Sequence, residues 1–388
     1  MKKIISSVLT GLAILPLLIA CGQSGGSAAT DSSSPAQVVG VAATTAVSPE
    51  VATDENSQTM ALWTQSDGAE NGVYVNYFDI STGLWSVAEP IAGLTGMTYS
   101  PAVAIEPGGN AIAVWREYTN DHYRAWVKRY SGSSGSWSPV EAIASVSDTE
   151  VRSPQAAIDS QGNALVVWYQ SDNQTLNIWS QSFRVDSGWA EPILLEQEVG
   201  SALSPRVAMD KQGNGLVAWV QSDGVRNNIQ GVFYNNLAGW GQPFTVDSTD
   251  NTVLAPNVAM NVNGQALIAW YQWEGDKYTL QGNYFAGSWS GPRTIESDFA
   301  GGELDVQVAI AADGRAVATW KQHDGERQNV WRTVFDPASG WGLAEILNNA
   351  NQLTDVTAKT AVAADGTLVA IWVEYGQEGS TLWGNAIH

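Results

Sequence analysis

The apolar and polar positions of the chain follow one pattern that recurs along almost its whole length. In residues 154–168, a segment of mixed polarity ends at Asp159, a turn containing Gly162 follows, and a near-continuous apolar run leads to Trp168. An apolar run without alternation predicts a strand that is buried on both faces. The glycine before it supplies the positive φ that a tight hairpin turn requires. Each copy therefore predicts two antiparallel strands joined by a tight turn.

Seven copies of this pattern set the register of the chain. They follow one another at intervals of 50 to 53 residues, and each has a tryptophan at the end of its apolar run, called here the ladder tryptophan. Fourteen residues before it stands an opening position, which is proline in the first five copies. The ladder tryptophans are Trp63, Trp115, Trp168, Trp219, Trp270, Trp320 and Trp372. A fixed period of this length predicts a stacked or radial repeat protein.

Two further segments complete each repeat. The third alternates more clearly, as in residues 178–183, and in repeats two to six the fourth follows a Gly-Trp or Ser-Trp pair such as Gly188-Trp189, with Leu84-Trp85 at this place in the first repeat. Four antiparallel strands per repeat, with inner strands apolar on both faces, are typical of a propeller blade. The sequence thus predicts an all-β, seven-bladed β-propeller. Thirteen of the 18 tryptophans stand at the ladder or fourth-strand position, so we interpret them as packing between blades.

The seventh repeat has no fourth strand of its own before His388. In the other repeats the fourth-strand tryptophan lies 16 or 17 residues before the next opening position, and counting back 16 from Pro49 reaches Ser33. Residues 34–39 match residues 138–143 in register. We therefore predict that residues 33 to about 45 supply the missing strand and close the ring, which removes an open sheet edge.

The first 20 residues predict a bacterial export signal. Lys2 and Lys3 precede an apolar stretch, and the sequence Leu-Ile-Ala-Cys at residues 18–21 resembles a bacterial lipobox. In a lipobox the cysteine receives lipid, palmitate included, and becomes the first residue of the mature protein. Cys21 is the only cysteine of the chain, so it has no intramolecular disulfide partner. An ordinary cleaved signal that happens to precede a cysteine is the alternative.

These features predict three parts: residues 1–20 as a lipoprotein signal peptide, residues 21–32 as a flexible Gly/Ser tether and residues 33–388 as the propeller. We expect the protein in the bacterial cell envelope, attached to the membrane only through its lipid. Gly22, rather than Asp, after the cysteine favours the outer membrane if the source is Gram-negative.

The charge of the chain limits its partners. Without Lys2 and Lys3 it has 16 basic and 39 acidic residues, a net charge of −23. Such a charge argues against binding nucleic acid, and against binding anionic lipid through the domain surface. We expect a monomer.

An acidic residue recurs at the end of the predicted first strand, five residues after the opening position. In the first four repeats this residue is Asp54, Glu106, Asp159 and Asp210. If the first strands line a central channel, these side chains would gather on one arc of it, and calcium prefers several carboxylate oxygens. The alternative is turn chemistry, because an aspartate ahead of a glycine turn accepts backbone N–H groups. The sequence predicts no other cofactor.

The loops between the second and third strands differ most between repeats, and we expect function where a repeat departs from its average. Several of these loops carry aromatic rings beside carboxylates and histidines. Such rings stack on the apolar faces of sugars, and acids accept hydrogen bonds from sugar hydroxyls. The candidate ligand-binding residues are Tyr118, His122, Tyr123, Trp273, Glu274, Tyr278, His323, Asp324 and Tyr375. The alternative is that each residue only completes its loop.

Catalytic motifs are sparse. The three histidines stand in different repeats, and the sequence contains no Gly-x-Ser-x-Gly, no His-Glu-x-x-His and no phosphate-binding loop. A glycosidase needs only two carboxylates that flank the scissile bond, so the abundant Asp and Glu leave that reaction open. We name no catalytic residue from the sequence.

The pattern Pro-x-Val-Ala-x-Asp-x-x-Gly-Asn-Ala…Trp…Gln-Ser-Asp-Gly…Gly-Trp resembles the uncharacterised propeller repeats common in bacterial exported proteins, and it covers residues 33–388. The resemblance implies the fold and no particular activity. We therefore expect a lipid-anchored envelope propeller that acts as a non-catalytic binding or scaffold module for a protein or glycan. The alternative is a carbohydrate-active enzyme of the glycoside hydrolase type that uses loop carboxylates.

Overall fold

The computed structural model describes most of the chain after residue 36. The described residues are 37–39, 45–54, 56, 58–66, 71–79, 81–92, 97–119, 122–143, 149–247, 250–296, 304–323, 328–346, 356–362, 368–376 and 379–387. The chain divides into two units, residues 1–31 and Ser32–His388, and all described residues belong to the second. The predicted signal peptide, Cys21 and the tether lie outside the described residues. The described part contains no helix, and so none that could cross a membrane.

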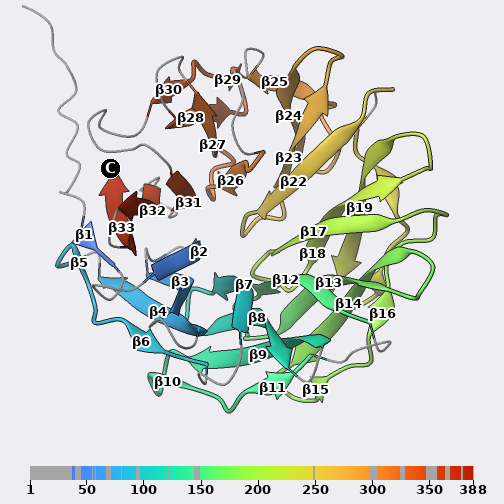
Figure 1. Cartoon of the computed structure of the whole chain (residues 1–388). Helices are drawn as coiled ribbons and strands as arrows, with labels where there is room; N and C mark the ends of the chain where they lie inside the picture. Colours follow the sequence, from blue (N-terminus) through green and yellow to red (C-terminus); the bar gives the residue numbers. More distant parts are fainter. Residues whose placement is uncertain are drawn as a thin grey trace, which may run out of the picture. The chain divides into compact units, whose positions relative to one another are not determined.

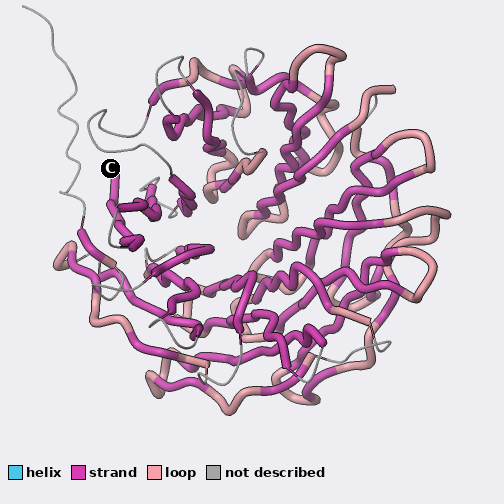
Figure 2. The backbone as a smooth tube through the Cα atoms, in the orientation of Figure 1, coloured by secondary structure: helices cyan, strands magenta, loops and turns pink. Residues whose placement is uncertain are grey.

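Seven blades stand around a central axis, and the first strand of each blade lies innermost (Figure 1). These inner strands are β2 (Thr45–Thr53), β7 (Met97–Ile105), β12 (Val151–Ile158), β17 (Ala202–Met209), β22 (Val253–Met260), β26 (Gln307–Ile310) and β31 (Val356–Val362). The fold confirms the prediction of an all-β, seven-bladed propeller. Strands make up most of the described backbone, and loops join their ends (Figure 2).

The second and third strands of each blade continue the antiparallel order outward. The second strands are β3 (Thr59–Ser66), β8 (Ala111–Thr119), β13 (Ala164–Ser171), β18 (Gly215–Ser222), β23 (Ala266–Trp273), β27 (Ala316–His323) and β32 (Leu368–Gly376). The third strands are β4 (Asn71–Asp79), β9 (His122–Ser131), β14 (Leu176–Arg184), β19 (Asn227–Asn235), β24 (Tyr278–Phe285), β28 (Gln328–Asp336) and β33 (Gly379–Ile387). In the five described turns that contain the predicted glycine, its φ lies between 74° and 88°, as the hairpin turn requires.

The outer strand of most blades is broken into two short pieces that both pair with the third strand. These pairs are β5 (Leu84–Trp85) with β6 (Glu89–Pro90), β10 (Ser136–Trp137) with β11 (Glu141–Ala142), β15 (Gly188–Trp189) with β16 (Ile193–Leu194), β20 (Gly239–Trp240) with β21 (Phe244–Thr245), and β29 (Gly340–Trp341) with β30 (Glu345–Ile346). Blade five differs, since its outer strand is β25 (Arg293–Glu296), preceded by a single bridge between Phe285 and Trp289.

The N-terminal strand β1 (Gln37–Val38) completes the last blade. Gln37 and Val38 pair antiparallel with residues 383–384 of β33. The N–H of Val39 donates to the carbonyl of Leu382 at 2.8 Å, and the Val39 side chain is 2% exposed. A parallel bridge between β33 and the start of β2 then joins this blade to the first. The ring is therefore closed by an N-terminal strand, as the sequence predicts.

The ladder tryptophans fill the spaces between blades. Those of the first six blades are at most 1% exposed. Trp168 belongs to one core cluster with Ile112 and Val114 of the preceding blade, and Trp270 belongs to another with Leu216. The interpretation of these residues as inter-blade core is confirmed.

A glutamine two residues after the ladder tryptophan satisfies the buried polar groups beside it. The Nε1 of Trp168 donates to Oε1 of Gln170 at 3.3 Å, and Nε2 of Gln170 donates to the carbonyl of Thr149 at 2.8 Å. The same indole-to-glutamine bond forms in three other blades, at 2.7 to 3.0 Å. Polar groups buried this deeply need such partners, so the repeated glutamine is part of the packing between strands.

Deleting residues 33–39 removes the strand that closes the ring. We expect the deletion to lower the free energy of unfolding by about 2–4 kcal/mol, because it removes a buried valine and several ladder hydrogen bonds. Urea denaturation followed by tryptophan fluorescence measures the change. As the matched control, deletion of residues 23–32 should change it by less than about 0.5 kcal/mol. Equal losses from the two deletions would show that β1 adds nothing to the ring.

Candidate binding site at the ring axis

The two faces of the ring carry different loops. Each first strand begins beside the end of the second strand, as where Met97 pairs with Tyr118. The hairpins between second and third strands therefore lie on the face where the first strands begin, which we call the hairpin face. The tight turns between first and second strands lie on the opposite face, which we call the turn face.

The four acidic residues predicted as metal ligands lie at the turn face and hold their own turns. Oδ1 of Asp159 accepts two backbone N–H groups, at 2.8 and 2.9 Å, and Oδ2 accepts from the Asn163 side chain. Asp210 repeats this pattern, and Asp54 and Glu106 also accept two backbone N–H groups each. In the part of the chain that the structure describes, no three His, Cys, Asp or Glu side chains come together as metal ligands. The structure thus gives these acids a role in turns, and Asp54, Glu106 and Asp210 also border one cavity at the turn face.

The predicted residues of blade two form an aromatic cluster on the hairpin face. The ring centres of Tyr118 and Tyr123 lie 5.0 Å apart, and Tyr99 lies 5.7 Å from Tyr123. The guanidinium carbon of Arg116 lies 4.6 Å from the Tyr123 ring centre, within the range of a cation–π interaction. His122 begins β9 at the exposed tip of the hairpin. Blade two therefore presents three rings and a cation at the rim, with Tyr118 and Tyr123 from the hairpin and Tyr99 from β7.

The predicted residues of blade five also meet within one hairpin. The rings of Trp273 and Tyr278 lie edge to face with centres 4.9 Å apart. Glu274 between them accepts hydrogen bonds from Gln272 at 2.6 Å and from Asn251 at 2.9 Å. These bonds fix the carboxylate beside the rings.

The remaining predicted rim residues belong to blades six and seven. His323 ends β27 on the hairpin face. Asp324 lies outside the described residues, and of Tyr375 only the backbone, in β32, is described. The structure therefore assembles the predicted residues hairpin by hairpin, most clearly in blades two and five.

Sequence reasoning missed a layer of polar side chains around the axis. In every blade the residue after the opening position pairs with the residue before the ladder tryptophan, so seven residues stand at one height. We call them the axial layer: Glu50, Ala102, Gln155, Arg206, Asn257, Gln307 and Lys359. Six of the seven are polar. The sequence signal was this variable polar position directly after the opening residue.

A cavity of about 240 Å³ lies at the axial layer. Six of the seven blades contribute to its lining, which shows that the side chains converge. It lies on the side of the axial layer toward the hairpin face, because its other lining residues precede the axial layer in the first strands. The charged and amide residues that line it are Glu50, Gln155, Arg206, Asp305 and Lys359.

A β-bulge precedes the axial layer in each of the first five blades. The residue before the opening proline has a φ of 44° to 54°, and the strand register shifts there. Four of these residues are serine and the fifth is Ala255. A positive φ in a residue other than glycine stores strain that only the surrounding structure holds in place, and bulges re-aim side chains. In blade six Asp305 takes the place of the serine and adds its carboxylate to the cavity.

Half of the axial layer forms a continuous chain of polar contacts. Asn257 donates to Gln307 at 3.3 Å, and Gln307 donates to Asp305 at 2.7 Å. Nζ of Lys359 lies 3.0 Å from Oδ2 of Asp305 and 3.4 Å from Oε1 of Glu50. This arc fixes two carboxylates around one ammonium group.

The surroundings of this arc shift the pKa values of its two carboxyl groups in opposite directions. Burial raises the pKa of Glu50 above its usual value, and the attraction of Lys359 only partly offsets this. Burial also acts on Asp305, but the charge and hydrogen bond of Lys359 hold the pKa of Asp305 below its usual value. Burial disfavours the charged form of Lys359, yet Asp305 and Glu50 raise its pKa in sum.

The opposite half of the cavity is lined by hydrogen-bond donors. Arg206 and Gln155 each donate to the carbonyl of the proline that precedes them, at 3.0 Å. Among the described residues Arg206 has no ion pair, although its charge acts on Glu50 and Asp305 across the cavity. A molecule at the axis therefore meets a cation and an amide on one side and two carboxylates on the other.

Comparisons with known proteins place the fold but not the activity. Neither protein-family models nor curated proteins gave a match. A protein of unknown function from Dyadobacter fermentans is similar in structure, with 10% identity, a TM-score of 0.55 and coverage of 92% of this chain and 98% of that one. A polysaccharide lyase of family PL25, an ulvan lyase, has 11% identity, a TM-score of 0.56 and coverage of 87% and 96%. At such identities the similarity shows the fold alone.

A third similar structure is the propeller domain of the Trilobed protease from Pyrococcus furiosus. It has 10% identity, a TM-score of 0.53 and coverage of 88% of this chain and 95% of that one. That domain is described as having an open velcro topology. The present ring differs from that description, because β1 pairs with β33.

Replacing the axial lysine tests the charge arrangement. We expect Lys359→Met to lower the free energy of unfolding at pH 7 by about 1.5–3 kcal/mol, because two half-buried carboxylates lose their cation. Asp305, whose pKa is lowered in the folded protein, contributes stability above its unfolded pKa and loses it as the pH falls. Lys359, whose pKa is raised, contributes below its unfolded pKa and loses it only as the pH rises through the folded value.

The difference between wild type and Lys359→Met should therefore be largest between about pH 5 and pH 9 and shrink toward pH 3, where the carboxylates protonate. Urea denaturation at a series of pH values measures it. Lys211→Met, at an exposed turn position, is the matched control and should show no such dependence. A difference for Lys359→Met that stays constant from pH 3 to pH 7 would contradict the arrangement.

Proposed function

We propose that the propeller is a non-catalytic glycan-binding module of the cell envelope that holds the end of a saccharide chain in the axial cavity. The observation that carries this proposal is the convergence of Glu50, Arg206, Asp305 and Lys359 on one cavity, on the side of the axial layer where the aromatic hairpins lie. A protein partner bound at the same rim is the alternative within the binding class.

The chemistry of the cavity suits a ligand with many hydroxyl groups. The carboxylates of Glu50 and Asp305 accept hydrogen bonds, Arg206 and Gln155 donate them, and hydroxyls do both. The strained bulges in front of the axial layer hold these groups in advance of binding, which lowers the entropic cost of association. The three rings of blade two and the Trp273–Tyr278 pair offer stacking surfaces for sugar units further along the chain. One protein of similar structure, the ulvan lyase of family PL25, is a polysaccharide lyase.

A glycan array with the purified protein, followed by calorimetric titration of the selected glycan, tests this function. We expect Arg206→Met to weaken binding about ten- to hundredfold, because hydrogen bonds to a charged group contribute about 1.5–3 kcal/mol. Arg315→Met, at an exposed position on the turn face paired with Asp313, is the matched control and should bind as wild type. An array without any bound glycan, or a glycan whose affinity is the same for Arg206→Met and wild type, would refute the axial site.

A second candidate function rests on the two axial carboxylates. Glu50 has a raised pKa and Asp305 a lowered one, and both contact the Lys359 ammonium, so their oxygens cannot be further apart than the sum of those two contacts. Carboxyl groups whose environments push their pKa values apart are typical of acid and base pairs in glycoside hydrolysis. Turnover of the selected glycan that is lost in both Glu50→Gln and Asp305→Asn would favour the enzyme over the binding module.

We also propose that a lipid on Cys21 holds this module at the outer membrane, as the sequence at residues 18–21 indicates. In a Gram-negative host the protein should partition into the detergent phase of Triton X-114, and its intact mass should show a lipid-modified N-terminal cysteine. Cys21→Ser should move it to the aqueous phase, whereas Ser24→Ala should not. An unmodified Cys21 in the mature protein would contradict the anchor and leave the glycan proposal untouched.

A further inference from the structure

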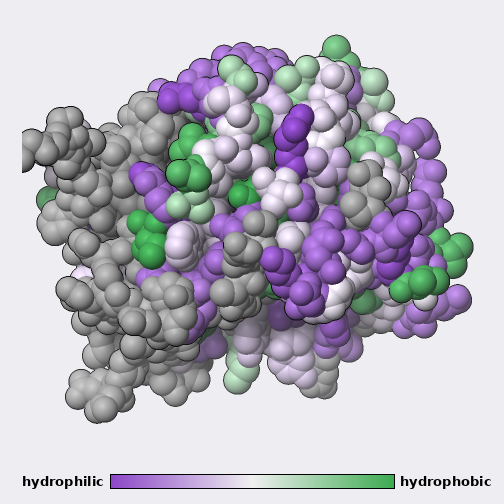
Figure 3. Space-filling view, turned by 90° about the horizontal axis from the view of Figure 1, so that it is seen from above, coloured by the Kyte–Doolittle hydropathy of each residue, from purple (hydrophilic) through white to green (hydrophobic). Residues whose placement is uncertain are grey.

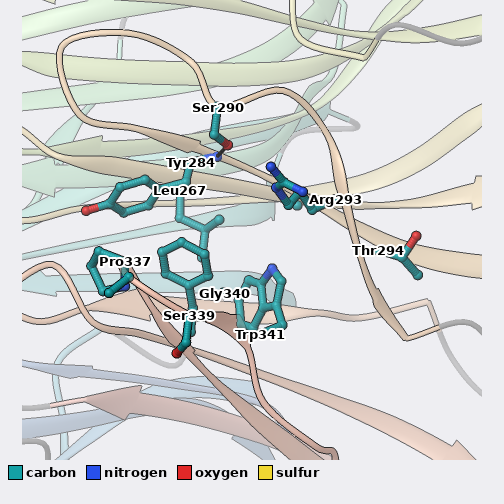
Figure 4. Close-up of a pocket in the computed structure, with 12 residues that line it drawn as sticks. Leu267, Tyr284, Ser290, Arg293, Thr294, Pro337, Ser339, Gly340 and Trp341 are labelled. Carbon is teal, nitrogen blue, oxygen red and sulfur yellow. Dashed lines mark hydrogen bonds between the residues drawn. The ribbon is translucent and has the colours of Figure 1, made fainter.

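A cavity of about 510 Å³ lies between blades five and six, away from the axial layer. Blade five lines it with β24 and β25, and blade six with β29 and the turn before it. Figure 4 shows Arg293 and Ser290 on one side and Pro337 and Trp341 on the other, and Phe335 also lines the cavity. The outer wall over these blades faces the viewer in Figure 3, where hydrophilic side chains prevail and apolar ones lie between them.

The interface between blades four and five explains why this cavity exists. There Phe244, which pairs with Gly231, packs between the blades with its ring centre 5.5 Å from Phe233 and 5.7 Å from Trp289. In blade five the residue that pairs with the corresponding glycine, Gly282, is Arg293. Arg293 is exposed, so the space that a phenylalanine fills in one interface stays open in the next.

The other aromatic residues of the interface between blades four and five have counterparts in the interface between blades five and six. Tyr284 and Phe335 lie 4.8 Å apart, and Phe335 lies 5.2 Å from Trp341. Phe244 covers one side of Trp289. Among the described residues no such ring covers the corresponding side of Trp341, which borders the cavity. The turn of blade five is also shorter, with residues 286–288 in place of the five residues 235–239 of blade four.

Two polar groups of blade five are left without partners. Tyr284 is 8% exposed, and its hydroxyl has no hydrogen-bond partner among the described residues. Arg293 likewise has no ion pair or hydrogen bond in the described part of the chain. The net charge of the protein is −21, and five other arginines pair with carboxylates within 3.5 Å: Arg129, Arg152, Arg226, Arg315 and Arg332. A cation that borders an aromatic cavity and lacks a carboxylate is therefore suited to an external anion.

We propose that this inter-blade cavity binds a sugar ring that carries a carboxylate, which goes beyond the axial site. The apolar face of the ring stacks on Trp341, as aromatic residues do with flat apolar surfaces. The carboxylate pairs with the guanidinium of Arg293, whose fork of N–H donors matches a carboxylate in shape. The hydroxyls of Ser290 and Ser339, which line the cavity, provide partners for the sugar hydroxyls.

Ligand-observed NMR with glucuronate as the probe tests this site, with glucose as the neutral counterpart and benzoate as an aromatic carboxylate. We expect glucuronate to bind with a Kd of about 1 mM and glucose at least about tenfold more weakly. Arg293→Phe rebuilds the arrangement of Phe244 in blade four, so it should fold, melt at or above the wild-type temperature and lose glucuronate binding. Arg293→Gln keeps the cavity open and should weaken binding at least about tenfold. Arg315→Met should bind as wild type.

The same titration on Arg206→Met separates the two sites. Unchanged glucuronate binding in this variant, together with its loss in Arg293→Phe, assigns the binding to the inter-blade cavity whether or not the axial site binds a glycan. Binding that survives Arg293→Phe, or that disappears in Arg206→Met, overturns the assignment. Equal affinity for glucose and glucuronate would refute the role of Arg293. Binding of benzoate but not of glucuronate would refute the proposal that the ligand is a sugar.

Discussion

The packing of the ladder tryptophans between blades is the interaction on which the rest of the structure depends. Each described indole of the first six blades is almost fully buried, and burying a side chain of this size contributes about 4–6 kcal/mol at about 25 cal/mol per Å². In four of these blades the Trp-x-Gln hydrogen bond satisfies the indole nitrogen, the one polar atom that this burial removes from water. Side chains of this size, repeated at the same position of successive blades, space the blades around an axis.

The same tryptophans set the height of the axial layer. Because the residue before each ladder tryptophan pairs with an axial residue, the seven axial residues stand at the same height around the axis. Because the residue type at this position differs between repeats, the seven side chains together form a surface of mixed chemistry at the axis. Glu50 and Lys359, more than 300 residues apart in sequence, come within 3.4 Å because closure joins the first and last blades. The bulges at the opening prolines raise the cost of this arrangement, and strain of this kind is typical of binding sites.

Different parts of this structure were predictable to different degrees. The glycine turns, the buried runs and the missing fourth strand are local patterns, so they predict the blades and the closing strand β1 correctly. The pairing of Tyr118 with Tyr123 also follows from their place in one hairpin. The axial layer was not recognised, because its residues share a position and not a residue type. The bulges were not predictable either, since a residue before proline ordinarily adopts extended backbone with negative φ. The inter-blade cavity depends on Arg293 standing where blade four has Phe244, a difference that matters only once the packing is known.

A crystal structure of the protein soaked with the glycan that it binds most tightly tests the central claim most directly. The account predicts density for a sugar at the axis, with oxygens within hydrogen-bond distance of the Arg206 guanidinium and of the Glu50 or Asp305 carboxylate. Sugar density confined to the turn face, or an axis without sugar while the glycan is ordered elsewhere, would contradict the account.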